Sequence, residues 1–140
     1  MAGTEPSRNM NLFFKRKLGA PLVKIRASWG AVRADGIVFL RVWQDEVVKR
    51  DGGQYVRVAA HSKYPKDSDD FGWNERLRHI DLIRNNAKCY LVMCIAKDVD
   101  TNPRAIMEFI DDRVFVGGAI VDDGDTWIGR GPPVNLDDVG

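Results

Sequence analysis

Cysteine and histidine are scarce in this 140-residue sequence, which contains two of each. Cys89 and Cys94 lie five residues apart in one apolar segment, a pattern that fits neither a disulfide framework nor a zinc site. The acidic residues after position 121 lack the spacing and terminal glutamate of a calcium-binding loop. We therefore expect no metal site and no cofactor.

Long apolar runs are also absent. The longest, Tyr90–Ala96, has the length of a strand and is far shorter than the roughly 20 apolar residues of a membrane-spanning helix. Residues 1–11 contain no apolar core of a signal peptide. We expect a cytoplasmic protein without membrane contact.

Known catalytic motifs are missing as well, including the P-loop, GxSxG, HExxH and CxxC. One weaker arrangement remains, because Glu75 and His79 are four residues apart on an expected helix, beside Arg76. Such a trio could cleave RNA by acid–base catalysis, with the arginine stabilising charge on the phosphorus centre. The competing interpretation is an ordinary solvent-exposed helical pair, so we expect a protein that is not an enzyme.

Basic residues gather at the beginning of the sequence and acidic residues at the end. Residues 1–34 contain seven Lys or Arg and one acid, a net charge of +6, whereas residues 97–140 contain four Lys or Arg and ten acids, a net charge of −6. Either the two ends lie side by side and neutralise each other, or the basic part faces a polyanion.

Short apolar or alternating segments, separated by turn signals, predict a chain built mainly from strands. Ile37–Trp43 is nearly all apolar, which is typical of a central strand covered on both faces. Residues 22–29 alternate, which predicts a strand with Lys24, Arg26 and Ser28 on its wet face. Further strands are expected at 12–14, 55–58, 88–97, 105–110, 114–121 and 126–128.

One helix is predicted, over residues 73–87, with Asp70 as a possible cap. Its apolar residues recur at helical spacing, and its polar residues, including Glu75, Arg76 and His79, fill the remaining face.

These elements predict an α+β fold that is mainly β. We expect a curved antiparallel sheet, or a small barrel, of about seven strands with one main helix. Residues 1–11 are expected to be a flexible tail, residues 12–130 a single globular domain, and residues 131–140 a flexible acidic tail that begins near the two prolines.

Aromatic residues are interleaved with basic ones over much of the chain. Proteins that hold an unpaired base use aromatic faces for stacking and cations for phosphates. Trp29 lies beside a glycine and between basic positions, and Tyr64 lies in a polar segment, so both are candidates for stacking. The predicted nucleic-acid-binding residues are Lys24, Arg26, Ser28, Trp29, Arg33, Arg41 and Tyr64.

The order of elements over residues 12–130, with one amphipathic helix and an aromatic–basic cluster, resembles the PUA-like barrels, a group that includes EVE, YTH and SRA domains. The resemblance implies a small curved sheet that grips modified or flipped bases, often beside a separate nuclease. It extends to no diagnostic motif, so no site residue is transferred from those families.

The leading hypothesis is a non-catalytic nucleic-acid-binding module that reads a modified or flipped base. A second hypothesis is a protein-interaction module whose opposite charged poles support self-association or a larger assembly. The third is a small nuclease that uses Glu75, His79 and Arg76.

Overall fold

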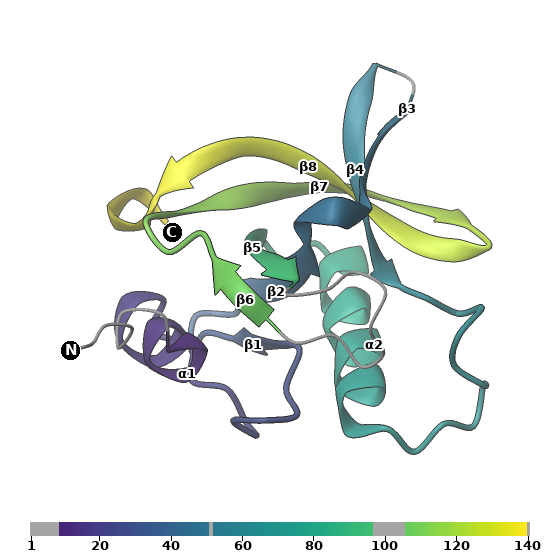
Figure 1. Ribbon diagram of the computed structural model, residues 1–140, viewed down its shortest axis with the longest axis horizontal. Coiled ribbons are helices and arrows are strands. Elements are labelled where there is room, and N and C mark those ends of the chain that lie inside the picture. Colours follow the sequence, from purple (N-terminus) through teal and green to yellow (C-terminus); the bar gives the residue numbers. More distant parts are fainter. Residues whose placement is uncertain (1–8, 51, 97–105, 140) are drawn as a thin grey trace.

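The computed structural model describes residues 9–50, 52–96 and 106–139, which form one open, curved sheet of eight strands with helices against it (Figure 1). The strands are β1 (Gly30–Val32), β2 (Val38–Trp43), β3 (Val47–Arg50), β4 (Gly53–Ala59), β5 (Cys89–Ala96), β6 (Ile106–Phe109), β7 (Arg113–Asp123) and β8 (Asp125–Asn135). The helical elements are α1 (Met10–Leu12), a π-helical turn (Phe13–Lys17), α2 (Phe71–Arg84) and two 3-10 turns (Gln44–Glu46 and Leu136–Asp138). The expected α+β class, mainly β, is confirmed.

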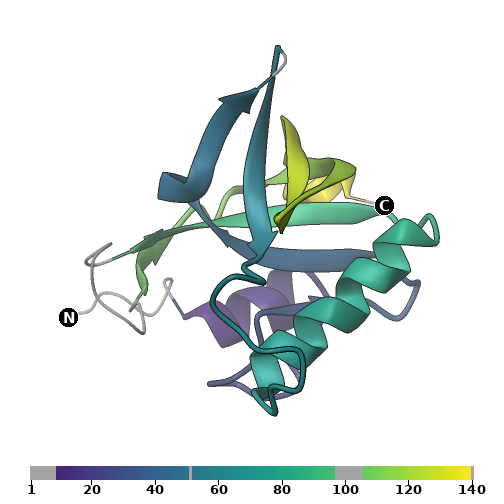
Figure 2. The same cartoon turned by 90° about the vertical axis from the view of Figure 1, so that its right-hand side faces the viewer.

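Strand order in the sheet is β1-β2-β5-β7-β8-β4-β3, and β6 also pairs with β5. Most neighbours are antiparallel, as tight turns require, but β2 and β5 are parallel. A parallel pair needs a long crossover, and here the crossover contains β3, β4 and α2. The hairpin of β3 and β4 stands away from the body of the molecule, as both overall views show (Figures 1 and 2).

Strand β2 is buried on both faces, as its apolar run predicts. Phe39 belongs to a core that also contains Phe13 and Phe14 from the N-terminal helical segment. Leu40, its neighbour, belongs to a second core shared with Trp73 of α2. Successive side chains of a strand point to opposite faces, so the two helical segments cover opposite sides of the sheet.

Two strands expected near the N-terminus are wrong. Residues 12–14 are helical, and the buried residues Phe13, Phe14 and Leu18 pack from one helical segment against the sheet. Residues 22–29 form a turn that ends just before β1, because the backbone N–H groups of Ala27 and Ser28 close locally on the carbonyl of Lys24. Apolar and polar residues thus alternate in a turn that pairs with none of the described strands.

Strand β8 continues past residue 130 through both prolines to Asn135, so ordered structure extends beyond the boundary expected there. Strand β4 pairs with β8 only as far as Gly129, whereas β7 pairs with β8 up to Asn135. Beyond Gly129 one edge of β8 has no paired strand among the described residues, and prolines are tolerated where no ladder hydrogen bond is needed.

Helix α2 begins two residues earlier than expected and ends three residues earlier, at Arg84. The Asp70 side chain accepts a hydrogen bond from the Trp73 N–H, so Asp70 is the N-cap as predicted. The placement of its polar face is wrong. Glu75, Arg76 and His79 belong to the buried face of the helix, and Leu82 is 42% exposed.

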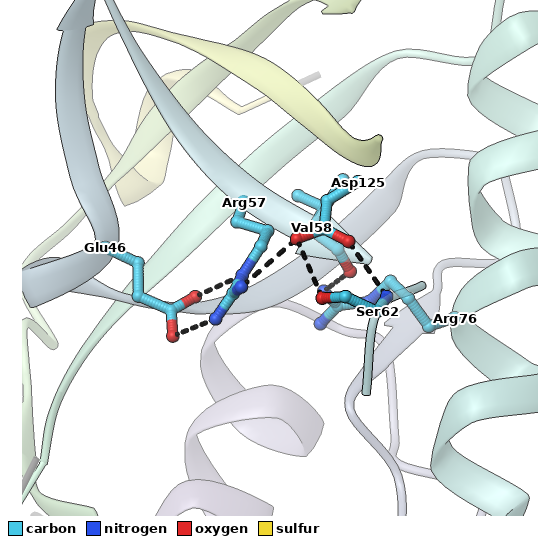
Figure 3. Close-up of polar contacts among 6 residues, drawn as sticks. All are labelled: Glu46, Arg57, Val58, Ser62, Arg76 and Asp125. Carbon is cyan, nitrogen blue, oxygen red and sulfur yellow. Dashed lines mark hydrogen bonds and ion pairs between the residues drawn. The ribbon is translucent and has the colours of Figure 1, made fainter. Parts of the chain in front are cut away.

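Arg76 explains why a polar helix face is buried. Its guanidinium donates to the carbonyl oxygens of Val58 (2.8 Å), Trp29 (2.8 Å) and Arg41 (2.7 Å); Figure 3 shows the contact with Val58. These acceptors lie in β4, just before β1, and in β2. Burial lowers the pKa of Arg76 to about 10, so the side chain stays charged at neutral pH. One buried cation therefore ties α2 to three separate segments.

Replacing Arg76 by methionine should lower the free energy of unfolding by about 3–5 kcal/mol, because three backbone carbonyls lose a charged donor. Urea unfolding monitored by circular dichroism measures the change. Arg78→Met is the control, because Arg78 is exposed on the same helix, and its effect should stay within about 0.5 kcal/mol. Equal effects of the two substitutions would contradict this role for Arg76.

Candidate functional site

Two irregular segments meet at the amino-terminal end of α2. One is the 22–29 turn, defined here as residues 22–29, and the other is residues 60–70, which connect β4 to α2 (Figures 1 and 2). The Lys24 ammonium lies 4.3 Å from the centre of the Phe71 ring. The rings of Trp29 and Tyr64 are 5.7 Å apart between centroids. The two segments therefore form one continuous surface.

Four rings form an aromatic cluster on this surface: Trp29, His61, Tyr64 and Trp73. Tyr64 stacks on Trp73 with a centroid distance of 4.6 Å and an angle of 7° between planes. Trp29 meets both rings edge-on, and His61 meets Trp73 edge-on at 5.2 Å. Trp73 is buried, whereas Trp29 and Tyr64 are partly exposed. Trp73 thus forms the inner part of the cluster, and Trp29 with Tyr64 forms its accessible edge, the aromatic rim.

The backbone of Trp29 is held by two consecutive residues of α2. Its N–H donates to the Glu75 carboxylate (2.9 Å), and its carbonyl accepts from Arg76 (2.8 Å). The indole packs over Gly72, where a Cβ atom would collide with it. The Arg76 guanidinium lies 5.7 Å from the centre of the indole. Trp29 is therefore fixed in place by both its backbone and its ring.

Ser28 stabilises the 22–29 turn from inside the protein and is not exposed for contact with a ligand. Its hydroxyl donates to the Glu75 carboxylate (2.9 Å) and accepts from the Lys24 N–H (3.0 Å), and the residue is fully buried. Glu75 thus anchors the end of the turn as well as Trp29. The expectation of Ser28 on a solvent-facing strand is wrong.

The basic residues predicted to bind phosphate separate into two groups. Lys24 and Arg26 are exposed in the 22–29 turn, and among the described residues neither has an ion-pair partner. Arg33 pairs with Asp35 at 2.7 Å and lies over Phe39, on the opposite side of the sheet from Trp29.

Arg41 is half-buried in β2, on the face opposite to Leu40, and desolvation lowers its pKa. Neither Arg33 nor Arg41 therefore joins the surface around Trp29. Of the seven predicted binding residues, the structure brings together Lys24, Arg26, Trp29 and Tyr64.

Several acidic residues near the end of the chain pair with arginines from the middle of the sequence. Asp122, Asp123 and Asp125 pair with Arg84, Arg50 and Arg57, respectively. Arg57 also binds Glu46, as Figure 3 shows. At the other side of the molecule Arg16 and Lys17 line an open cavity together with Asp112, Asp137 and Asp138. Basic and acidic residues from the two ends thus lie near each other at the π-helical turn. Lys24 and Arg26 form no ion pair with the residues that the structure describes.

Several contributors to this surface have no signal in the sequence pattern. His61 makes a 3.0 Å hydrogen bond with Thr126, and Ser62 donates its N–H to Asp125 (Figure 3), which pins residues 61–62 to the start of β8. Lys63 and Lys66 flank Tyr64 and are exposed. Exposed carboxylates at Asp67 and Asp69 follow them, so the positive charge is least opposed on the 22–29 turn.

The trio considered for acid–base catalysis is buried and has a structural role. Glu75, Arg76 and His79 are 2%, 4% and 7% exposed, and both carboxylate oxygens of Glu75 already accept hydrogen bonds. Burial lowers the pKa of His79 to about 4, with smaller effects from Arg76 and Arg78. Because these groups are buried, they are not placed to contact a polymeric substrate, and a nuclease that uses them has no support from this arrangement.

Cysteine chemistry has no support at the described positions, because burial raises the pKa of Cys89 to about 12 and of Cys94 to about 11. Within residues 9–50, 52–96 and 106–139, no three His, Cys, Asp or Glu side chains are grouped as a metal site would need. No helix in the same part of the chain is both long and apolar enough to span a bilayer.

No family model, curated protein or solved structure matches the chain.

Acid should destabilise the protein through His79. Because its pKa falls from 6.5 to about 4 on folding, the unfolded chain binds more protons between those values. Above pH 6.5 this difference in pKa does not reduce the free energy of unfolding. As the pH falls from 6.5 towards 4, it lowers the free energy of unfolding by at most about 3 kcal/mol. In His79→Gln, the plot of unfolding free energy against pH should be flatter over this window in urea titrations. An unchanged slope would show that His79 does not carry the effect.

Proposed function

We propose that this protein is a nucleic-acid-binding module whose contact surface is the amino-terminal end of α2. Lys24 and Arg26 contact phosphates, and Trp29 with Tyr64 receives a base. The observation that carries the proposal is that two exposed cations, which form no ion pair with any described residue, share one surface with a partly exposed aromatic pair.

Phosphate neutralisation is the main sequence-independent source of nucleic-acid affinity. A lysine or arginine already paired with a carboxylate must break that pair before it can contribute, as Arg33, Arg50 and Arg57 would have to. Lys24 and Arg26 form no ion pair with residues 9–50, 52–96 or 106–139, so no such pair has to be broken. This difference supports the 22–29 turn as the phosphate-binding element.

Stacking of a base needs an aromatic face that is accessible and held in place. Glu75 and Arg76 hold Trp29 through its backbone, so binding does not have to order this residue. Bases inside a duplex have no free face, which favours single strands, loops or extruded bases as ligands. The PUA-like resemblance, which was drawn from the expected order of elements, stays a prediction.

The self-associating module with opposite charged poles has less support. Asp122, Asp123 and Asp125 pair within their own chain, so the acidic end offers fewer free carboxylates than the sequence implies. If the protein self-associates through charge, sedimentation should show an oligomer at low salt and a monomer at high salt.

Replacing Lys24 and Arg26 together by alanine should weaken binding to a labelled 12-nucleotide single strand about tenfold or more at 50 mM salt. The plot of log Kd against log salt should also become shallower by roughly one to two, because two phosphate contacts are lost. Fluorescence anisotropy over 50–300 mM salt measures both quantities.

The matched control replaces Lys49 and Arg78 by alanine, which removes the same charge from exposed positions on β3 and the middle of α2. This control should bind nearly as the unaltered protein does. Equal losses in the two double variants would show only a general charge effect. Absence of binding by the unaltered protein at low salt would refute the proposed function.

A further inference from the structure

The 22–29 turn displays the two most exposed large apolar side chains in the described part of the protein. Val23 is 74% exposed and Ile25 is 61% exposed, whereas the next, Leu82, reaches only 42%. Isolated exposed apolar residues are common on protein surfaces, but two within three residues on one turn form a local apolar tip.

The turn holds this tip in a fixed position. Leu22 before it is 6% exposed and Ser28 after it is fully buried, so both ends are anchored in the protein. Between them the Lys24 carbonyl accepts two backbone hydrogen bonds, and the Lys24 N–H donates to Ser28. Ser28 is itself bound to Glu75 of α2. The apolar tip is therefore supported by the same carboxylate that positions Trp29.

Cations alternate with the apolar residues at the tip, in the order Val23, Lys24, Ile25, Arg26. The ammonium of Lys24 rests over Phe71, next to the glycine on which Trp29 packs. A ligand that covers Val23 and Ile25 must therefore accept positive charge directly beside an apolar contact, and must lie close to the aromatic rim.

We propose that Val23 and Ile25 form a wedge that enters between stacked bases while Lys24 and Arg26 hold the flanking phosphates. This inference rests on the proposed function and names its ligand class: a duplex with a locally weakened step, such as a mismatch or a single-nucleotide bulge. The displaced base then lies against Trp29 and Tyr64.

The energetic balance decides why a weakened step is preferred. The gain from burying two branched side chains is comparable to the cost of unstacking one base step. On a perfect duplex the two effects nearly cancel, so binding there depends mainly on phosphate contacts. Where a mismatch or bulge has already weakened the stack, the cost falls and the gain remains.

A lipid surface is the less favoured ligand for this tip. An amphipathic helix that attaches to a membrane surface buries many apolar side chains, whereas this turn offers two. In addition, the aromatic rim next to the turn can stack on a planar base.

The test compares the unaltered protein with the double variant V23S/I25S, using two 20-base-pair duplexes. One duplex is fully matched and the other has a single-nucleotide bulge beside 2-aminopurine, whose fluorescence rises when it is unstacked. The matched control is V48S/L82S, which changes two exposed apolar residues on β3 and α2. All three proteins are first shown to melt cooperatively, which the exposure of the four positions leads us to expect.

The unaltered protein and V48S/L82S should bind the bulged duplex about tenfold more tightly than the matched one and should raise the 2-aminopurine signal. V23S/I25S should lose this preference and the signal, while its affinity for the matched duplex stays within about twofold because Lys24 and Arg26 are retained.

Equal preference for the bulge in V23S/I25S and the unaltered protein would overturn the wedge but leave the proposed function standing. The wedge is also wrong if the unaltered protein binds both duplexes equally. Failure to bind duplexes and single strands at low salt would refute the proposed function itself. If V23S/I25S binds both duplexes normally but loses binding to phosphatidylserine-containing vesicles, the tip serves a membrane surface and the wedge is refuted.

Discussion

Glu75 and Arg76, two consecutive residues of α2, satisfy both polar groups of the Trp29 backbone, and the rest of the structure depends on this arrangement. Arg76 also supplies donors to β2 and β4, and Glu75 secures the 22–29 turn through Ser28. Burying these charges is costly unless their hydrogen bonds are formed, so these contacts couple the helix to the sheet and to the turn. As a consequence, Trp29, the main aromatic residue of the candidate site, is held in place before any ligand binds.

Parts of the fold were predictable because their signals are local. The apolar run of β2 and the helical spacing in α2, with Asp70 at its start, depend only on neighbouring residues. The buried polar face of α2 was not predictable, because its acceptors are carbonyls that come from three distant segments. Likewise, alternation in residues 22–29 looks like a strand, and only the closure of its backbone on Lys24 shows that it is a turn.

The candidate site was predictable only in part, because some of its features depend on contacts between distant segments. Lys24 and Arg26 are exposed, as expected of charged residues in a surface segment, and the rings of Trp29 and Tyr64 lie close together. The use of both rings for stacking stays a prediction. Arg41 looked like one more cation, yet it is half-buried in a strand that is covered on both faces. The wedge-like tip was hidden because a strand would have turned its apolar residues inward.

The most direct measurement is a titration of isotope-labelled protein with an unlabelled single-stranded oligonucleotide, followed by the NMR shifts of backbone amides and indole N–H groups. The account predicts that the largest changes fall on residues 22–29 and 61–66 and on the indole of Trp29, with β3 and the π-helical turn at Phe13–Lys17 unaffected. Changes centred on either of those two elements, or none at millimolar oligonucleotide, would contradict it.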